Sequence, residues 1–163
     1  MKLTKSKIVM IVAAALGIVT IFMLLLAGLG ASDAPKGADF PSVFNMMFGT
    51  GDFYGKGKLS VGTFNFLLFL PFLLLLVGIA LSVVSLFVDN KILKIVAIAC
   101  FVVAGIFFFL TKSLSPLSVK SDMRKLFKDT LKYFKLGIGA ILAGIMSLLS
   151  GVAACVGTFV IKK

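Results

Sequence analysis

Four long blocks of apolar residues constrain this chain more than any other feature of its sequence. They run approximately over residues 8–30, 61–88, 92–110 and 136–161. An α-helix needs about 20 apolar residues to cross a bilayer, and no block alternates apolar and polar residues as a barrel strand does. Because a backbone in lipid must satisfy its own hydrogen bonds, helices are the expected form. The sequence therefore predicts an all-α integral membrane protein, a single membrane domain (residues 1–163) built as a bundle of four transmembrane helices.

The composition also favours lipid as the main solvent. Of 163 residues, 60% are apolar and 14% are charged, against about 45–50% and about 25% in soluble domains. Lys94 is the only charged residue inside the four blocks, and it lies near an edge, where a lysine reaches the headgroups. Lysines precede the first block as they would in an export signal. The block is longer than the ~7–15-residue apolar region of such signals, so we expect a retained first span.

The chain lacks most of the side chains on which catalytic and metal sites depend. It has no histidine, and its six acidic residues are aspartates that lie in loops. Carboxylate pairs, histidine metal sites and Ser-His-Asp triads are therefore not expected. Cys100 and Cys155 lie inside apolar blocks without CxxC spacing, which argues against a disulfide framework or a zinc site. We predict no catalytic residue, no cofactor and no metal, and hence a protein that is not an enzyme.

Small side chains form a stripe along the last apolar block. They recur alternately three and four residues apart, so they fall on one face of a helix. The residues of this seam are Gly137, Ala140, Gly144, Ser147, Gly151, Ala154 and Thr158. In lipid, small residues let helix backbones approach closely, which is the main route to helix association. The seam either packs within the bundle of one chain or faces another subunit, and lining a substrate path is a third role.

The loop over residues 31–60 is expected to hold a short amphipathic helix. Asp39 is a candidate N-cap and Gly49 a candidate C-terminal stop. The aromatic residues on its apolar face are Phe40, Phe44 and Phe48. This face is expected to contact the membrane surface, the protein's own bundle or a partner. The glycines after Gly49 predict turns, and Asn65 is expected to cap the second span rather than line a pore.

The loop over residues 111–135 carries the densest charge, and it predicts a basic amphipathic helix after Pro116. Its basic residues are Lys120, Arg124, Lys125, Lys128, Lys132 and Lys135. A helix of this kind either lies in the headgroup layer or docks on protein with its lysine face in solvent. Both interpretations remain open.

The net charge of +11 is spread over loops and termini that flank the apolar blocks. This placement is typical of membrane proteins, so nucleic acid is not an expected partner. Three lysines precede the first block, which favours cytoplasmic termini in a multi-pass protein of the plasma membrane. That orientation puts seven basic residues inside and ten outside, against the positive-inside rule, so reversed insertion is the alternative.

The plan of four spans, a longer first loop, a tight central hairpin and a second external loop is similar to that of claudin-type tetraspan proteins. That family uses tryptophan and cysteine in its first external loop, and this chain has neither there, so its adhesive and barrier roles do not carry over. Usage rich in lysine and poor in arginine indicates an AT-rich bacterial genome. We expect a non-catalytic accessory or scaffolding subunit, or a homo-oligomer, assembled through small-residue packing in the lipid bilayer. The alternative is a small channel or transporter formed by oligomerisation.

Overall fold

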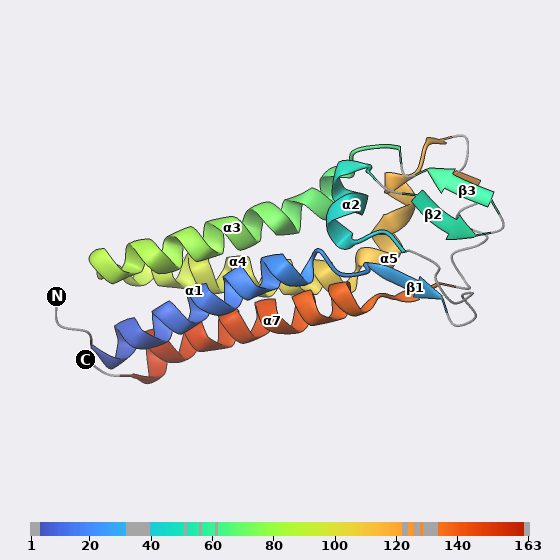
Figure 1. The fold of residues 1–163 in the computed structure, drawn as a ribbon. Helices are drawn as coiled ribbons and strands as arrows, with labels where there is room; N and C mark the ends of the chain where they lie inside the picture. The colour runs from blue at the N-terminus through green and yellow to red at the C-terminus, as the bar shows by residue number, and fades with distance from the viewer. Residues whose placement is uncertain are drawn as a thin grey trace.

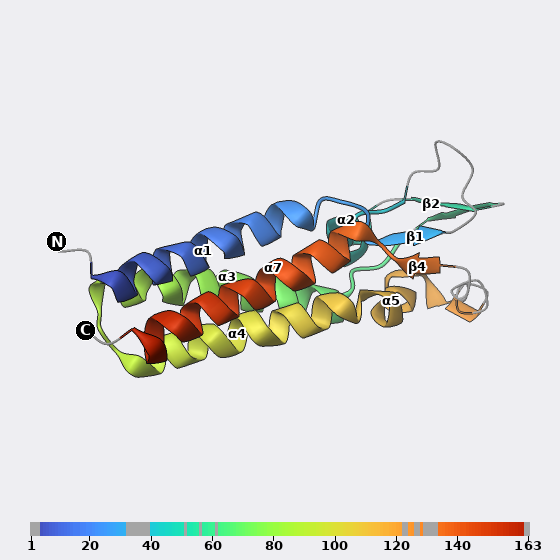
Figure 2. The same ribbon diagram turned by 90° about the horizontal axis from the view of Figure 1, so that it is seen from below.

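The computed structural model contains four long helices packed side by side (Figure 1). They are α1 (Lys5–Met23), α3 (Phe66–Phe87), α4 (Lys91–Phe109) and α7 (Ile138–Cys155), the last continued by the π-helical turn η4 (Val156–Val160). The structure describes residues 4–31, 40–50, 52–55, 57–60, 62–121, 124–125, 128 and 134–161. α1 packs against α3 and α7, and α4 packs against the same two helices. Successive helices run in opposite directions (Figure 2), which confirms the predicted four-helix bundle.

The outer surface of the bundle is apolar. All four long helices have the length and composition needed to cross a membrane. Large apolar side chains point outward along each of them, among them Ile18, Leu76, Ile106 and Val152. Such a surface favours contact with lipid over water. The length and apolar composition of the four helices therefore indicate a multi-pass membrane protein.

The helix boundaries follow from caps and turns. α3 begins at Phe66 because the side chain of Asn65 accepts a hydrogen bond from the N–H of Leu68 at 3.2 Å, as expected of a cap. α4 follows after a short turn and is capped by Asn90, which accepts from the N–H of Ile92 at 2.9 Å. Only residues 88–90 connect the two helices, so α3 and α4 form a tight antiparallel hairpin, as the sequence predicted.

The first and last spans are shorter at one end than the apolar blocks indicated. α1 ends at Met23, and the chain then enters strand β1 (Leu29–Ala31). Strand β4 (Phe134–Leu136) precedes α7 and pairs with β1 in antiparallel register, Gly30 opposite Lys135. Neither strand was predicted, because three residues carry too little periodicity to be recognised.

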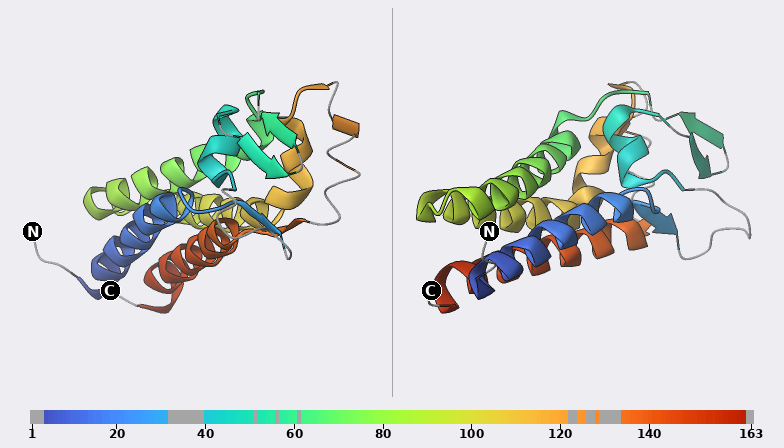
Figure 3. Two further views of the ribbon diagram at one scale, coloured as in Figure 1. Left: turned by 45° about the vertical axis from the view of Figure 1, so that its right-hand side comes forward. Right: turned by 60° about the vertical axis from the view of Figure 1, so that its left-hand side comes forward.

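The remaining elements gather beyond this end of the bundle, and we call them together the cap (Figure 3). The cap comprises β1, β4, helix α2 (Val43–Phe48), the hairpin of β2 (Asp52–Gly55) and β3 (Gly57–Ser60), helix α5 (Thr111–Leu114) and the 3₁₀ turn η1 (Ser115–Ser118). The start of α1 and the end of η4 lie at the other end of the bundle, which we call the terminus end (Figure 1).

The basic amphipathic helix predicted after Pro116 does not reach Lys135. Residues 124–125 and 128 are helical, but Phe134–Leu136 form strand β4. Pairing with β1 satisfies the backbone of both strands at once, which outweighs the helical periodicity of the side chains there. The apolar face predicted for residues 123–131 lies outside the described residues.

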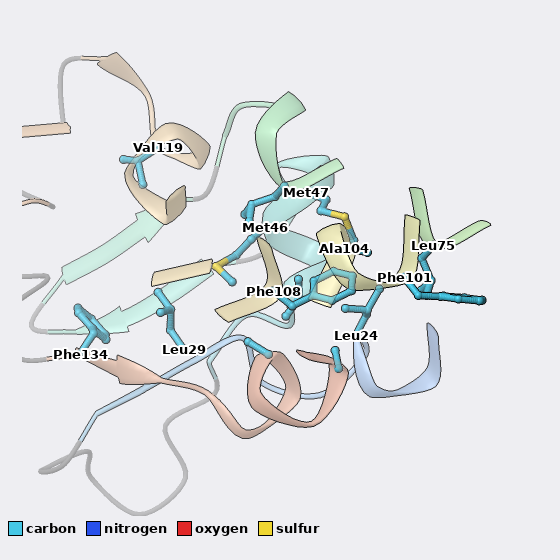
Figure 4. Packing of buried hydrophobic residues seen from close by; sticks show 14 residues of the cluster. Leu24, Leu29, Met46, Met47, Leu75, Phe101, Ala104, Phe108, Val119 and Phe134 are labelled. Atoms are coloured by element: carbon cyan, nitrogen blue, oxygen red, sulfur yellow. The ribbon is translucent and has the colours of Figure 1, made fainter. Parts of the chain in front are cut away.

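The buried core is concentrated in the half of the bundle next to the cap. Large side chains from the long helices and the cap meet there with no exposed area, including Leu24, Met46, Met47, Phe101 and Phe108 (Figure 4). Toward the terminus end a second cluster is built on three buried residues, Met10, Ala13 and Ala154. The cap and the adjacent half of the bundle therefore share one core.

Candidate functional site

Asn65 connects the start of α3 to both loops of the cap. Its amide nitrogen donates to the carbonyl oxygen of Leu114 and to the hydroxyl of Ser118, both at 2.9 Å. Its backbone N–H donates to the carbonyl oxygen of Met47 at 2.9 Å, at the end of α2. Asn65 is 2% exposed, so water does not compete for these bonds. The sequence predicted the capping role of Asn65, but not the bridge to residues 49 and 53 positions away.

The cap end of α7 lies against the chain that follows α1, backbone to backbone. The N–H of Gly137 donates to the carbonyl oxygen of Gly28 at 3.0 Å, and the N–H of Gly139 donates to that of Ala27 at 2.9 Å. A Cβ atom on Gly139 would lie 2.5 Å from the carbonyl oxygen of Leu26, and one on Gly137 would overlap that of Ala27. Only glycine permits this approach, so the two glycines fix the position of β1 and β4 on the bundle.

A patch of phenylalanine rings covers the junction of α2 and α3. Its members are Phe44, Phe48, Phe64, Phe69 and Phe72, and we call them the aromatic patch. The ring centroids of Phe44 and Phe48 are 4.7 Å apart, and those of Phe48 and Phe69 are 5.7 Å apart. Phe48 is 39% exposed and Phe64 is 51% exposed. The patch joins the cap to the bundle and still presents two rings outward.

The predicted face of the first-loop helix is partly rearranged. α2 ends at Gly49, as expected, with φ of 67° in the left-handed region. It begins at Val43, however, because the hydroxyl of Ser42 accepts from the N–H of Asn45 at 3.0 Å. The predicted cap, Asp39, lies outside the described residues. Phe40 precedes the helix, and its ring meets that of Phe134 edge to face, with centroids 6.3 Å apart.

The basic residues predicted for surface contact lie on the cap. Lys120, Lys125, Lys128 and Lys135 are exposed, and Arg124 is half-buried with its Nε donating to the carbonyl oxygen of Val119 at 3.4 Å. Lys132 lies outside the described residues. The exposed lysines belong to the same end of the molecule as the aromatic patch.

The seam packs inside the bundle of this chain. Ala140 and Ala154 have no exposed area, and Gly137, Gly144, Ser147 and Gly151 are also buried, whereas Thr158 is half-buried. A Cβ atom on Gly144 would lie 2.8 Å from the ring of Phe109, and one on Gly151 would lie 3.1 Å from Val102. The hydroxyl of Ser147 donates to the carbonyl oxygen of Phe101 at 2.7 Å. These contacts are with α4, so the small residues bring α7 against its neighbours in the same chain.

The interior of the bundle is filled by apolar side chains at the level of Leu75 and Phe101, both without exposed area. Three other buried hydroxyls of the spans donate to carbonyl oxygens of their own helix: Thr20 to Leu16 at 2.9 Å, Ser82 to Gly78 at 2.8 Å and Ser150 to Met146 at 2.9 Å. Within the described residues, every buried side-chain nitrogen and oxygen has a hydrogen-bond partner. The same residues contain no group of three or more His, Cys, Asp or Glu side chains placed to hold a metal ion.

The cap therefore carries both sets of predicted contact residues at one end of the molecule, the aromatic rings of the first loop and the lysines of the second. No sequence pattern assigns Phe64, Phe69 and Phe72 to this surface, because they belong to an apolar block that reads as a span. Comparisons with models of protein families, with curated proteins and with solved structures gave no match.

Proposed function

We propose that the protein is a non-catalytic accessory or scaffolding subunit whose bundle holds the cap at one membrane surface, where it binds a partner. The observation that carries the proposal is the fixed attachment of the cap through a buried side chain and a backbone pairing. Asn65 contributes two side-chain hydrogen bonds and one backbone hydrogen bond to this attachment, and β1 pairs with β4. A cap held in one geometry is pre-organised, which lowers the entropic cost of binding.

The aromatic patch and the exposed cap lysines are the proposed contact surface. Exposed aromatic rings supply a large contact area, and aromatic residues are enriched at protein interfaces. Basic residues at the same end of the molecule attract an acidic partner and set its orientation. The partner is another membrane protein or a second copy of this chain. In the second case the seam of α7 is not the interface, because its residues are already used within the bundle.

Size analysis in a neutral detergent tests this role, together with a pair of matched variants. We expect the wild type to form a discrete complex, and Phe48→Ala/Phe64→Ala to lose it while it keeps its thermal stability. The control is Val83→Ala/Ile95→Ala, which removes two similarly exposed side chains from the apolar faces of α3 and α4. A complex that survives in both variants contradicts the proposed surface. Solute flux through liposomes that contain the protein alone contradicts the accessory role and favours a channel.

We further infer that the termini are cytoplasmic and the cap is external, in the plasma membrane of a bacterium. The three lysines that precede the first apolar block, Lys2, Lys5 and Lys7, support this orientation. Single cysteines at Thr50 and Ser121, both exposed in the cap, and at Thr4, exposed at the terminus end, test it in a background without Cys100 and Cys155. A membrane-impermeant maleimide should label the two cap positions in intact cells and leave Thr4→Cys unlabelled. The opposite pattern means reversed insertion.

A further inference from the structure

A cavity of ≈ 660 Å³ opens at the terminus end, where α1, α4 and η4 meet the turn between α3 and α4. This volume lies within the range of about 300–1,000 Å³ that is typical of small-molecule sites. The charged residues that line it are Lys7, Lys91, Lys94 and Asp89. They come from two separate parts of the sequence, the start of α1 and residues 89–94, and the antiparallel order of the helices brings them to one place.

The lining of this cavity is positively charged. Three lysines stand against one aspartate, which leaves an excess of two positive charges. Lys94 is already paired, with its Nζ 2.9 Å from the carboxylate of Asp89 and its side chain 11% exposed. Within the described part of the chain, neither Lys7 nor Lys91 forms an ion pair. Lys7 is half-buried and Lys91 is exposed at the rim, so both ammonium groups are placed to meet an anion that enters.

Three of the four hydroxyls that line the cavity donate to the backbone. Ser6 donates to the carbonyl oxygen of Gly157, Ser85 to that of Ser82 at 2.7 Å, and Thr158 to that of Ala154 at 2.7 Å. Each of these three hydroxyls offers only lone pairs to the cavity. Lone pairs repel an anion, so the attraction for an anionic ligand comes from the lysines.

Apolar side chains border the charged ones. Phe159 and Ile161 line the same cavity, and Phe87, Val88 and Ile92 are exposed on the neighbouring turn at 74%, 52% and 68%. A lysine ammonium binds phosphate as a compact point charge, and basic pockets between transmembrane helices accept phosphate-bearing headgroups. A ligand with an anionic headgroup and apolar chains can contact both the lysines and the apolar side chains of this surface.

We propose that the cavity binds the phosphate group of an anionic ligand between Lys7 and Lys91, with Lys94 held in place by Asp89 behind it. The adjoining apolar surface favours a phospholipid headgroup as the carrier of that phosphate, over a soluble phosphate ester. This site is at the opposite end of the bundle from the cap, and it does not depend on the accessory role proposed above.

Thermal unfolding of the full-length protein in neutral detergent tests the site, with three probes at about 0.15 M salt. The probes are dioleoylphosphatidylglycerol, dioleoylphosphatidylcholine with the same chains, and glycerol 3-phosphate. The test variant is Lys7→Gln/Lys91→Gln. The matched control is Lys5→Gln/Lys112→Gln, which removes one exposed and one half-buried lysine, neither of which lines the cavity.

The anionic lipid should raise the melting temperature of the wild type and of the control more than the zwitterionic lipid does. In the test variant its apparent affinity should fall on the order of tenfold to thirtyfold, and Lys7→Arg/Lys91→Arg should restore it. An equal response to glycerol 3-phosphate, with the same dependence on Lys7 and Lys91, also supports the phosphate site and assigns it to a soluble ligand. Equal losses in the test and control variants, or equal responses to the two lipids, overturn the proposal.

Discussion

The two ends of the bundle are built on different principles. At the cap end, large side chains fill the core, Asn65 bridges three segments, and glycines let the start of α7 meet the chain that follows α1. At the terminus end, the helices meet through small residues around Met10 and leave a cavity lined by lysines. The difference indicates that stability is concentrated at one end, and that space for a ligand is left at the other.

The largest expected effect is the loss of the Asn65 side chain. Asn65→Ala removes a helix cap and two bonds from a buried amide, leaving the Leu114 carbonyl and the Ser118 hydroxyl without that donor. Together these losses should cost about 3 kcal/mol of unfolding free energy. Asn90→Ala at the other end removes only an exposed cap bond and should cost about 1 kcal/mol or less. Thermal unfolding in detergent measures the loss of stability in both variants. Equal losses would mean that the two ends do not differ in stability.

The second prediction compares one added methyl group at each end. Gly139→Ala puts a Cβ atom 2.5 Å from the carbonyl oxygen of Leu26, which belongs to backbone that has little freedom to move. The cost should be about 2 kcal/mol. Gly157→Ala puts a Cβ atom 3.3 Å from the Ser6 carbonyl oxygen and from Val9, a contact that small shifts relieve, so its melting temperature should change little. If Gly139→Ala is as stable as Gly157→Ala, the close backbone approach does not hold the cap.

A third prediction concerns the ion pair at the terminus end. Lys94→Met removes one partner of Asp89, whose side chain is 43% exposed. Because water reaches the aspartate, the loss should be about 1 kcal/mol at most and should shrink as salt is added. Unfolding temperatures at low and high salt measure it. A loss as large as that of Asn65→Ala, and insensitive to salt, would mean that this end is as tightly built as the other.

The smallest loss of stability is expected for a residue of α7 that lies between the cap and the terminus end. Ser147→Ala removes one hydrogen bond between α7 and α4, which should cost about 0.6 kcal/mol. Ser150 donates to Met146 of its own helix at 2.9 Å, so Ser150→Ala should be neutral or slightly stabilising. A reversed order of the two variants in a thermal scan would contradict the assignment of Ser147 to the contact between helices.

The parts of this fold that depend on local sequence could be predicted, and those that depend on distant partners could not. Apolar length indicated the four spans, and single residues such as Asn65 and Gly49 marked helix ends. β1 and β4 each gain their structure only from the other, across most of the chain. Neither strand carries a recognisable pattern of its own, and the glycines around β2 and β3 read as turns.

The candidate surfaces follow the same rule. Phe44 and Phe48 were recognised because they lie at helical spacing in one loop, whereas Phe64 and Phe69 join them only through the packing of α2 on α3. Lys7 and Lys91 belong to separate helices whose starts meet at the terminus end. Burial of the seam within one chain required the three-dimensional arrangement, because its spacing alone allowed two partners.

The pairing of β1 with β4 has a consequence for how the protein is made. β1 leaves the ribosome soon after the first span, but its hydrogen-bonding partner emerges only just before the last one. Until then the carbonyl oxygen of Gly28 lacks the hydrogen bond that it later accepts from the N–H of Gly137. Closure of this small sheet therefore waits until β4 has been synthesised, and a chain truncated before residue 134 would leave the edge of β1 open.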